Sequence, residues 1–290
     1  MAGKPRIAIV GAGNLGTALA ISLHRAGYPI AAVVGRRGKS LRQLRKVAKA
    51  VGALAVVNLD KVGGTGIQAD LVWFCVPDSE IANAARLLAG RLKWKGRLAL
   101  HSSGALASDE LKDLRRRGAA TASVHPLMTF VQDSQPSLAG VPFAIEGDVA
   151  ATRASRRIVR DLGGQAHAIR KQDKAAYHAW GTFASPLLTA LLATTEEVAI
   201  LAGVKRREVA PRMIPILLQT LANYAQFGAA GAFSGPIIRG DVETVKKHLR
   251  MLRRAPAGRE VYVALARAAI QFLPGKNKRS LKQLLDSLEK

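Results

Sequence analysis

The sequence predicts an α/β domain with a doubly wound, mostly parallel sheet, followed by an all-α domain. An apolar segment at residues 7–10 leads into the glycine turn at 11–16, and a helical pattern follows. Apolar strand patterns then alternate with helical ones through the first half of the chain. From residue 171 onward only helical periodicity is found. We therefore expect two domains, 1–170 and 171–290.

Short apolar segments with strand composition recur along the first domain. The expected strands are 7–10, 30–34, 55–57, 71–76, 97–101, 120–124, 141–145 and 165–169. Because helical patterns lie between several of them, they are expected to form a mostly parallel sheet.

The second domain is expected to contain helices only. They are predicted at 171–202, 205–227, 241–254, 257–272 and 278–289. Pro186 should kink or break the first of them. A sheet domain followed by a helical one predicts a cleft between the two, and ligands of open sheets bind outside the carboxyl ends of the strands.

The glycine turn has the features of a dinucleotide site. Gly11 allows a tight turn, Gly13 leaves room for a pyrophosphate, and Gly16 lets the helix pack closely on the strand. The backbone amides that open the helix, at Asn14 and Leu15, are expected to face the phosphates, because a helix N-terminus favours an anion.

Two further segments refine the cofactor prediction. Val76 and Pro77 end a neighbouring strand, where the cofactor's ribose or nicotinamide is expected. Roughly 20 residues past the last glycine, NAD-binding domains usually carry an acidic residue, but this chain has Arg36 and Arg37. Guanidinium groups pair well with a 2′-phosphate, so the predicted cofactor is NADP(H). The alternative is a solvated turn in a very basic protein.

Composition limits the class of protein. The only cysteine among the 290 residues is Cys75, so a cysteine-based metal cluster or disulfide framework is excluded, and a reduced, cytoplasmic setting is expected. No metal site is predicted. The best membrane-span candidate, residues 187–204, is interrupted by Glu196 and Glu197, and the start of the chain lacks a signal-peptide pattern, so no membrane association is expected.

The net charge of +24 raises the question of nucleic acid. The basic clusters are scattered over both halves, and the aromatic residues, 5% of the chain, do not interleave with them as a stacking platform requires. Solvated helix faces are the favoured interpretation, and nucleic-acid binding is not predicted.

Polar residues follow two neighbouring strands of the first domain. Ser102 and Ser103 come after His101, and His125 ends the next strand, so these side chains are expected at one edge of the sheet. They are candidates for binding a substrate carboxylate or carbonyl. The alternative for the serines is a cap for the helix near residues 108–116.

Lys174 and His178 lie four residues apart, on one face of the first helix of the second domain. Either side chain could protonate the oxyanion that forms when hydride reaches a carbonyl. The alternative is a surface lysine and a core histidine.

A turn-rich segment further on supplies more candidates for substrate binding. Arg239 lies in a glycine-bounded loop and could bind a carboxylate bidentately. Asp241 and His248 follow on one face of the next helix, and Asp241 also fits an N-cap.

Together these motifs resemble the Rossmann-like proteins that carry a C-terminal domain called DUF2520. That group is related to 6-phosphogluconate and 3-hydroxyisobutyrate dehydrogenases and to ketopantoate and pyrroline-5-carboxylate reductases. The resemblance covers nearly the whole chain. It rests on the glycine turn, His101–Gly104, His125–Leu127 with Phe130, Lys174 with Tyr177 and His178, and Gly235–Pro236 with Arg239–Asp241, Thr244 and His248.

The resemblance implies an N-terminal Rossmann domain that binds NADP(H) and a helical domain like the 6-phosphogluconate dehydrogenase C-terminal domain, which commonly forms a homodimer. In the 3-hydroxyacid dehydrogenase relatives, a lysine followed four residues later by asparagine is catalytic. Lys174 looks like that lysine, and His178 replaces the asparagine. Pro186 after Ser185 is a second departure from the family pattern.

The resulting hypothesis is an NADPH-dependent reductase of a small carbonyl or imine compound, expected to be a carboxylate such as a 2-oxo acid. Ketopantoate is suggested by the relatives alone. Lys174 or His178 would be the acid. The alternative is a non-catalytic NADP(H)-binding sensor or assembly protein.

Overall fold

The computed structural model describes residues 3–36, 41–65, 68–132, 134 and 136–288. Internal contacts divide the chain into two compact units, Met1–Phe183 and Ala184–Lys290. The division falls later than the predicted 170/171 boundary because helix α6 (Lys174–Thr182) anchors its first residue in the first unit.

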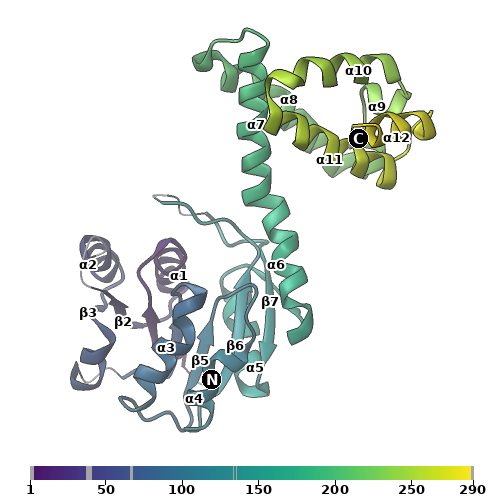
Figure 1. Cartoon of the computed structure of the whole chain (residues 1–290). Coiled ribbons are helices and arrows are strands. Elements are labelled where there is room, and N and C mark those ends of the chain that lie inside the picture. Colours follow the sequence, from purple (N-terminus) through teal and green to yellow (C-terminus); the bar gives the residue numbers. More distant parts are fainter. Residues whose placement is uncertain (1–2, 37–40, 66–67, 133, 135, 289–290) are drawn as a thin grey trace. The chain divides into compact units, whose positions relative to one another are not determined.

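The first unit is built on one eight-stranded sheet with the order β3-β2-β1-β4-β5-β6-β7-β8 (Figure 1). All neighbouring strands are parallel except β6 and β7. The doubly wound, mostly parallel sheet predicted from the sequence is thus confirmed. Its strands are β1 (Ile7–Val10), β2 (Ile30–Gly35), β3 (Leu54–Val57), β4 (Leu71–Phe74), β5 (Leu98–His101), β6 (Ala120–Pro126), β7 (Pro142–Gly147) and β8 (Gln165–Ala168).

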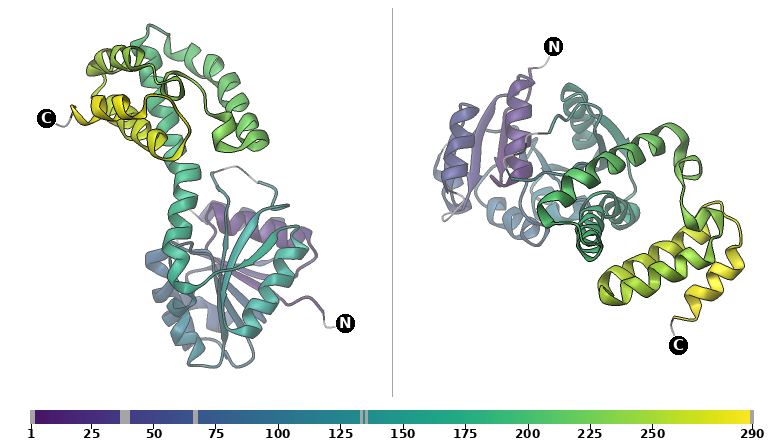
Figure 2. Two further views of the ribbon diagram at one scale, coloured as in Figure 1. Left: turned by 90° about the vertical axis from the view of Figure 1, so that its right-hand side faces the viewer. Right: turned by 90° about the horizontal axis from the view of Figure 1, so that it is seen from above.

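Helices cover both sides of this sheet (Figure 2). Along β1, Ile7 and Ile9 pack into one core with α1, α2 and α5, whereas Ala8 and Val10 pack into another with α3 and α4. Strands that are buried on both faces are apolar along their whole length, so apolar segments of the sequence predicted their positions. The helices of this unit are α1 (Asn14–Arg25), α2 (Leu41–Ala50), α3 (Asp78–Ala89), α4 (Lys112–Arg115), α5 (Val149–Asp161) and α6.

All regular secondary structure in the described residues of the second unit is helical. A small core joins α10, α11 and α12 through Val245, Leu249, Ala266, Leu281 and Leu285. The helices are α7 (Leu188–Leu201), α8 (Arg206–Ala232), α9 (Pro236–Arg239), α10 (Val242–Met251), α11 (Pro256–Phe272) and α12 (Lys278–Asp286).

Two interruptions separate the observed helices from the predicted ones. Pro186 lies in a π-helical turn, Phe183–Leu187, that joins α6 to α7, in keeping with the predicted kink or break. Within α8, Gly228 has a φ of 68°, so the regular helix is broken just after the predicted end at residue 227.

One segment of the described chain, Lys171–Leu201, is long and apolar enough to cross a membrane by length and composition. None of its apolar window is buried within the chain. The overlapping segment 187–204 was not expected to span a membrane because Glu196 and Glu197 interrupt it, but these two residues do not prevent Lys171–Leu201 from meeting the two criteria. Length and composition do not distinguish a membrane span from a helix that packs against another protein surface.

Candidate active site

The turn after β1 has the close packing predicted for its glycines. Gly11 has a φ of 114°, and a Cβ atom there would collide with the carbonyl oxygen of Cys75. A Cβ at Gly16 would collide with the carbonyl oxygen of Gly11 and lie 3.1 Å from the Cys75 Cβ. Both glycines therefore hold the turn against the end of β4, as the tight turn and close helix packing required.

A pocket of about 630 Å³ opens at this turn, within the first unit. Gly13 lines it, and a Cβ on Gly13 would meet no protein atom within 4 Å, so the glycine leaves a cradle that a side chain would fill. Gly13 is also the N-cap of α1 and has no side chain with which to cap the helix amides. The pocket thus places the N-terminal N–H groups and the positive end of the helix where an anion could bind.

The other predicted cofactor residues surround this turn in different ways. Val76 and Pro77 line the pocket. Leu15 packs its side chain on the core, so only its backbone amide is available to a ligand. The side-chain amide of Asn14 donates to the carbonyl oxygen of Phe130 at 3.2 Å, which ties a distant loop to the start of α1.

Arg36 lines the same pocket at the end of β2. Its Nη2 lies 2.5 Å from Oε2 of Glu80, which also lines the pocket from the first turn of α3. The predicted partner of Arg36 in recognising a 2′-phosphate, Arg37, lies outside the described residues.

A second polar cluster lies at the carboxyl ends of β5 and β6, at the same sheet edge. Lys174, the first residue of α6, is fully buried there. Its Nζ donates to the carbonyl oxygen of Ser103 at 3.0 Å and to Oγ of Ser123 at 2.8 Å. Burial lowers the pKa of Lys174 to about 8, although the charges of Glu146 and Asp78 act to raise it.

His101 is a structural residue of this cluster. Its Nε2 lies 3.0 Å from the carbonyl oxygen of Ala107, and its Nδ1 accepts from the backbone N–H of Ser103 at 3.2 Å. A carbonyl can only accept, so the proton is on Nε2 and the ring is neutral. Burial lowers the pKa of His101 to about 4, which is consistent with the neutral form.

The hydroxyl groups of Ser102 and Ser103 make contacts within the protein. Oγ of Ser102 accepts from the indole N–H of Trp73 at 2.8 Å. Oγ of Ser103 donates to Oδ2 of Asp78 at 2.7 Å and accepts from the backbone N–H of Leu106 at 2.9 Å. Both serines hold the loop after β5 in shape, and their predicted contact with substrate stays a prediction.

His125 and His178 face each other beside this loop. Nδ1 of His125 lies 3.0 Å from the Ser102 carbonyl oxygen and must donate to it, which leaves Nε2 as the acceptor atom. The ring centroids of His125 and His178 are 5.8 Å apart in an edge-to-face arrangement. A Cβ on Gly104 would lie 2.8 Å from Nε2 of His125 and would collide with Cδ2 of His178. Gly104 therefore gives both imidazoles the space that they occupy.

Exposure separates the two predicted catalytic residues. His178 is solvent-exposed, whereas Lys174 is fully buried. Tyr177 lies edge-to-face with His125, with centroids 6.2 Å apart, and burial raises the pKa of its hydroxyl. His178 is thus accessible enough to contact a substrate. Buried Lys174 instead holds the loop after β5 through its hydrogen bond to the Ser103 carbonyl oxygen.

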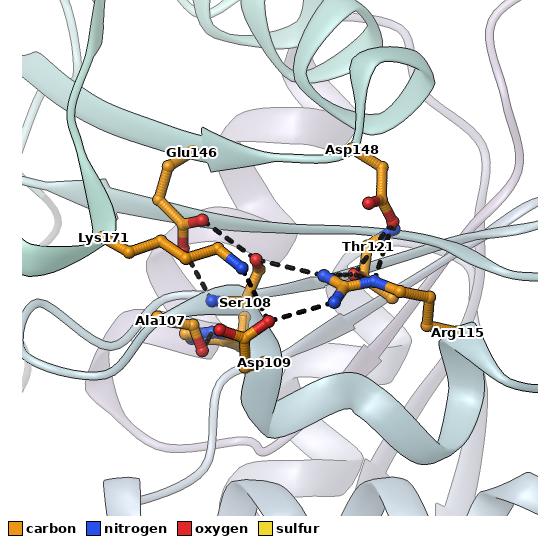
Figure 3. A network of polar contacts seen from close by, with 9 residues as sticks. Ala107, Ser108, Asp109, Arg115, Thr121, Glu146, Asp148 and Lys171 are labelled. Carbon is orange, nitrogen blue, oxygen red and sulfur yellow. Dashed lines mark hydrogen bonds and ion pairs between the residues drawn. The ribbon is translucent and has the colours of Figure 1, made fainter.

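A polar network fastens the far end of the loop and the start of α6 (Figure 3). Buried Glu146 of β7 accepts from the backbone N–H of Ser108 at 2.6 Å and from its hydroxyl at 2.9 Å. Asp109 accepts from Lys171 at 2.6 Å and from Arg115 at 3.0 Å. Lys171 precedes α6, so the contact links the helix that carries His178 to the loop region.

The remaining predicted substrate residues lie in the second unit. Asp241 is the N-cap of α10, as the sequence also allowed, and its Oδ1 accepts from the backbone N–H of Thr244 at 3.0 Å. His248 makes a 3.1 Å contact from Nδ1 to the hydroxyl of Tyr262. Arg239 is exposed at the end of α9. Their predicted roles in binding substrate stay predictions.

Four residues of the cluster were not predicted from the sequence as site residues: Asp78, Gly104, Ser123 and Tyr177. Asp78 is the first residue of α3, and Ser123 lies within β6. Their contacts cross 25 residues for Asp78 to Ser103 and 51 for Ser123 to Lys174. Contacts between residues so far apart in the sequence produce no local periodicity from which they could be predicted. Across the described residues, no group of three or more His, Cys, Asp or Glu side chains could hold a metal ion.

Comparison with protein-family models identifies the class of each part. Residues 2–126 match the model of a Rossmann-like domain, and residues 141–269 match DUF2520, a domain of unknown function. The chain therefore combines a Rossmann-like domain with a DUF2520 domain, as the motifs indicated. No curated protein matches it.

Solved structures share this fold over nearly the whole chain. An inferred NADP oxidoreductase from Bacteroides fragilis is 22% identical with a TM-score of 0.74, and the match covers 91% of this chain and 97% of that one. A reductive aminase from Aspergillus terreus, in complex with NADPH and ethyl-5-oxohexanoate, is 17% identical (TM-score 0.61; 96% and 98% covered). An imine reductase from Pseudomonas sp. is 20% identical (TM-score 0.60; 92% and 94% covered).

Proposed function

We propose that this protein is an NADPH-dependent reductase of a small carbonyl or imine compound, expected to be a carboxylate such as a 2-oxo acid. One observation carries the proposal. The anion-binding pocket at the ends of β1 and β4 and the imidazole cluster at the ends of β5 and β6 lie along one edge of the sheet. The fold neighbours that bind NADPH and reduce imines support the same chemistry.

The pocket fits NADP(H). The Gly13 cradle and the uncapped amides of α1 would hold the pyrophosphate, and Arg36 would pair with the 2′-phosphate. Val76 and Pro77 would border the nicotinamide end. When bound, the cofactor supplies the hydride.

The protein's own residues would orient the substrate and move a proton. Lys174 keeps the Ser103 carbonyl and the Ser123 hydroxyl in place, so we assign it a positioning role. Burial lowers the pKa of His125, and the neutral form of the ring presents its Nε2 lone pair beside Gly104. His178 is exposed and belongs to the residue type used most often as a general acid, so we assign it the transfer of the proton to substrate.

The test is a fluorescence titration with NADPH and NADH, followed by turnover with a panel of small oxo acids and cyclic imines. We expect NADPH to bind and one compound to oxidise it. NADPH binding without oxidation by any compound would favour the sensor alternative. Failure to bind either nucleotide would contradict the proposal at its first step.

His178→Asn tests the proton donor. We expect kcat to fall by about 100-fold or more while the Kd of NADPH stays the same, since general-acid catalysis contributes about 10²–10⁴-fold. His167→Asn, on the exposed edge strand β8, is the matched control and should leave both quantities unchanged. Equal kcat values for the His178 variant and the control would exclude His178 as the acid.

A further inference from the structure

The ion pair between Arg36 and Glu80 places opposite charges at one position in the nucleotide pocket. Nη2 of Arg36 lies 2.5 Å from Oε2 of Glu80, and both residues line the pocket. They come from different elements, the end of β2 and the first turn of α3. The guanidinium that would recognise a 2′-phosphate thus already has a carboxylate partner.

Glu80 lies in the first turn of α3, where a negative charge interacts favourably with the helix dipole. Its side chain is 33% exposed, against 68% for Arg36, so the carboxylate is the more enclosed member of the pair. A 2′-phosphate that approaches Arg36 would meet this negative charge at short range.

We propose that Glu80 sets the nucleotide preference of this protein: by pairing with Arg36, it competes with the 2′-phosphate and limits the discrimination between NADPH and NADH. The inference rests on the proposed nucleotide site. A phosphate dianion must displace Glu80 from Arg36 or bind beside it, and like charges a few ångströms apart repel strongly outside bulk water. NADH carries no 2′-phosphate and avoids this competition.

Binding measured by calorimetry tests the proposal without any turnover. The ligands are NADPH, NADH and 2′,5′-ADP, and the variants are Glu80→Gln, Arg36→Met and the double variant. We expect Glu80→Gln to tighten NADPH and 2′,5′-ADP by about fivefold and to leave NADH unchanged or weaker. In the Arg36→Met background, most of that gain should disappear, because Glu80 acts through Arg36.

Asp60→Asn is the matched control, since it removes another carboxylate from the same pocket without altering the ion pair. If it tightens NADPH as much as Glu80→Gln does, the general field of the pocket explains the effect and the inference is wrong. The inference is also wrong if the wild type binds NADPH and Glu80→Gln does not tighten it. If neither the wild type nor Glu80→Gln binds any of the three ligands, the proposed function fails together with the inference.

Discussion

Lys174 is charged at neutral pH although its side chain is fully buried. Its pKa is lowered from 10.5 to about 8, first by burial. Between these values the unfolded chain binds a proton that the folded protein has released, so the free energy of unfolding rises with pH in this window. The full change corresponds to about 3 kcal/mol.

The comparison of wild type with Lys174→Met isolates this effect. The difference in the free energy of unfolding, measured by urea titration, should move in favour of the wild type between pH 8 and 10. The buried tyrosine Tyr28, whose pKa is raised, acts in the opposite direction at higher pH but is common to both proteins and cancels. A difference that does not vary with pH would contradict the lowered pKa of Lys174.

Replacement of Gly13 should affect nucleotide binding much more than the stability of the fold. Its φ is −73°, and a Cβ would meet no protein atom within 4 Å, so Gly13→Ala should lower stability by only about 0.5 kcal/mol, through the weaker N-cap. The same methyl group would fill the cradle, and we expect the Kd of NADPH to rise at least tenfold. The measurements are thermal unfolding and nucleotide titration.

Gly90→Ala is the control for Gly13→Ala. Gly90 also has open space around its Cβ position, but it lies at the end of α3 and does not line the pocket. Its replacement should leave nucleotide affinity unchanged. Unchanged affinity in Gly13→Ala as well would show that the pyrophosphate does not approach this glycine.

Residue types in the sequence indicated where the site lies better than what each residue does. His101 and His125 were expected at one sheet edge and are found there. However, His101 is occupied by the Ala107 carbonyl and the Ser103 amide. Whether a polar side chain at a strand end faces a ligand or the backbone depends on loop conformation, which residue spacing does not specify.

At the scale of elements, Glu146 connects β7 to the turn that ends the Ser102–Ser103 loop. It gives Ser108 two charge-assisted hydrogen bonds in a buried setting. Glu146→Ala would leave the backbone N–H of Ser108 without this partner, and we expect a loss of about 2–3 kcal/mol in the free energy of unfolding. Urea titration measures it.

Glu110→Ala provides the comparison, because Glu110 lies in the same turn and its carboxylate has no hydrogen bond or ion pair among the described residues. This variant should change stability by less than about 0.5 kcal/mol. Equal losses in the two variants would mean that the turn itself, and not the contact with β7, is sensitive to substitution.

The ends of helices and strands could be predicted where the residues at those positions favour one local structure. The strand ends were predicted to within two residues, and the signal was clearest for β1 and β4, which are apolar and buried on both faces. The first helix of the second half was predicted over 171–202, kinked or broken at Pro186, and the two helices on either side of Pro186 belong to different units. That division depends on the burial of Lys174 among residues distant in sequence, which no helical periodicity reveals.

At the scale of the whole molecule, α8 exposes a row of large apolar side chains. Ile214, Leu218 and Leu221 lie on one helix face and are 50%, 62% and 56% exposed. Large apolar side chains exposed on one helix face are typical of an interface, and we propose that a second copy of the chain covers them in a homodimer. Sedimentation equilibrium should give the mass of a dimer for the wild type and of a monomer for Leu218→Glu/Leu221→Glu.

Gln219→Glu, which adds a charge on the same helix away from this face, should remain dimeric. A lipid membrane is the alternative that the length and composition of the neighbouring segment Lys171–Leu201 allow, and flotation with lipid vesicles tests it. A wild-type protein that is monomeric and floats with vesicles would contradict the homodimer and favour a membrane surface.

The single thiol of the chain has a practical consequence. Cys75 is partly buried beside the glycine turn and lines the nucleotide pocket, and burial raises the pKa of its thiol to about 12, so little thiolate is present at neutral pH. Fluorescent maleimides should therefore react far more readily at exposed cysteines introduced elsewhere. One dye can then be attached to an exposed helix of each unit while the rest of the protein stays unaltered. Resonance energy transfer between the two dyes, measured with and without nucleotide, reports the distance between the units.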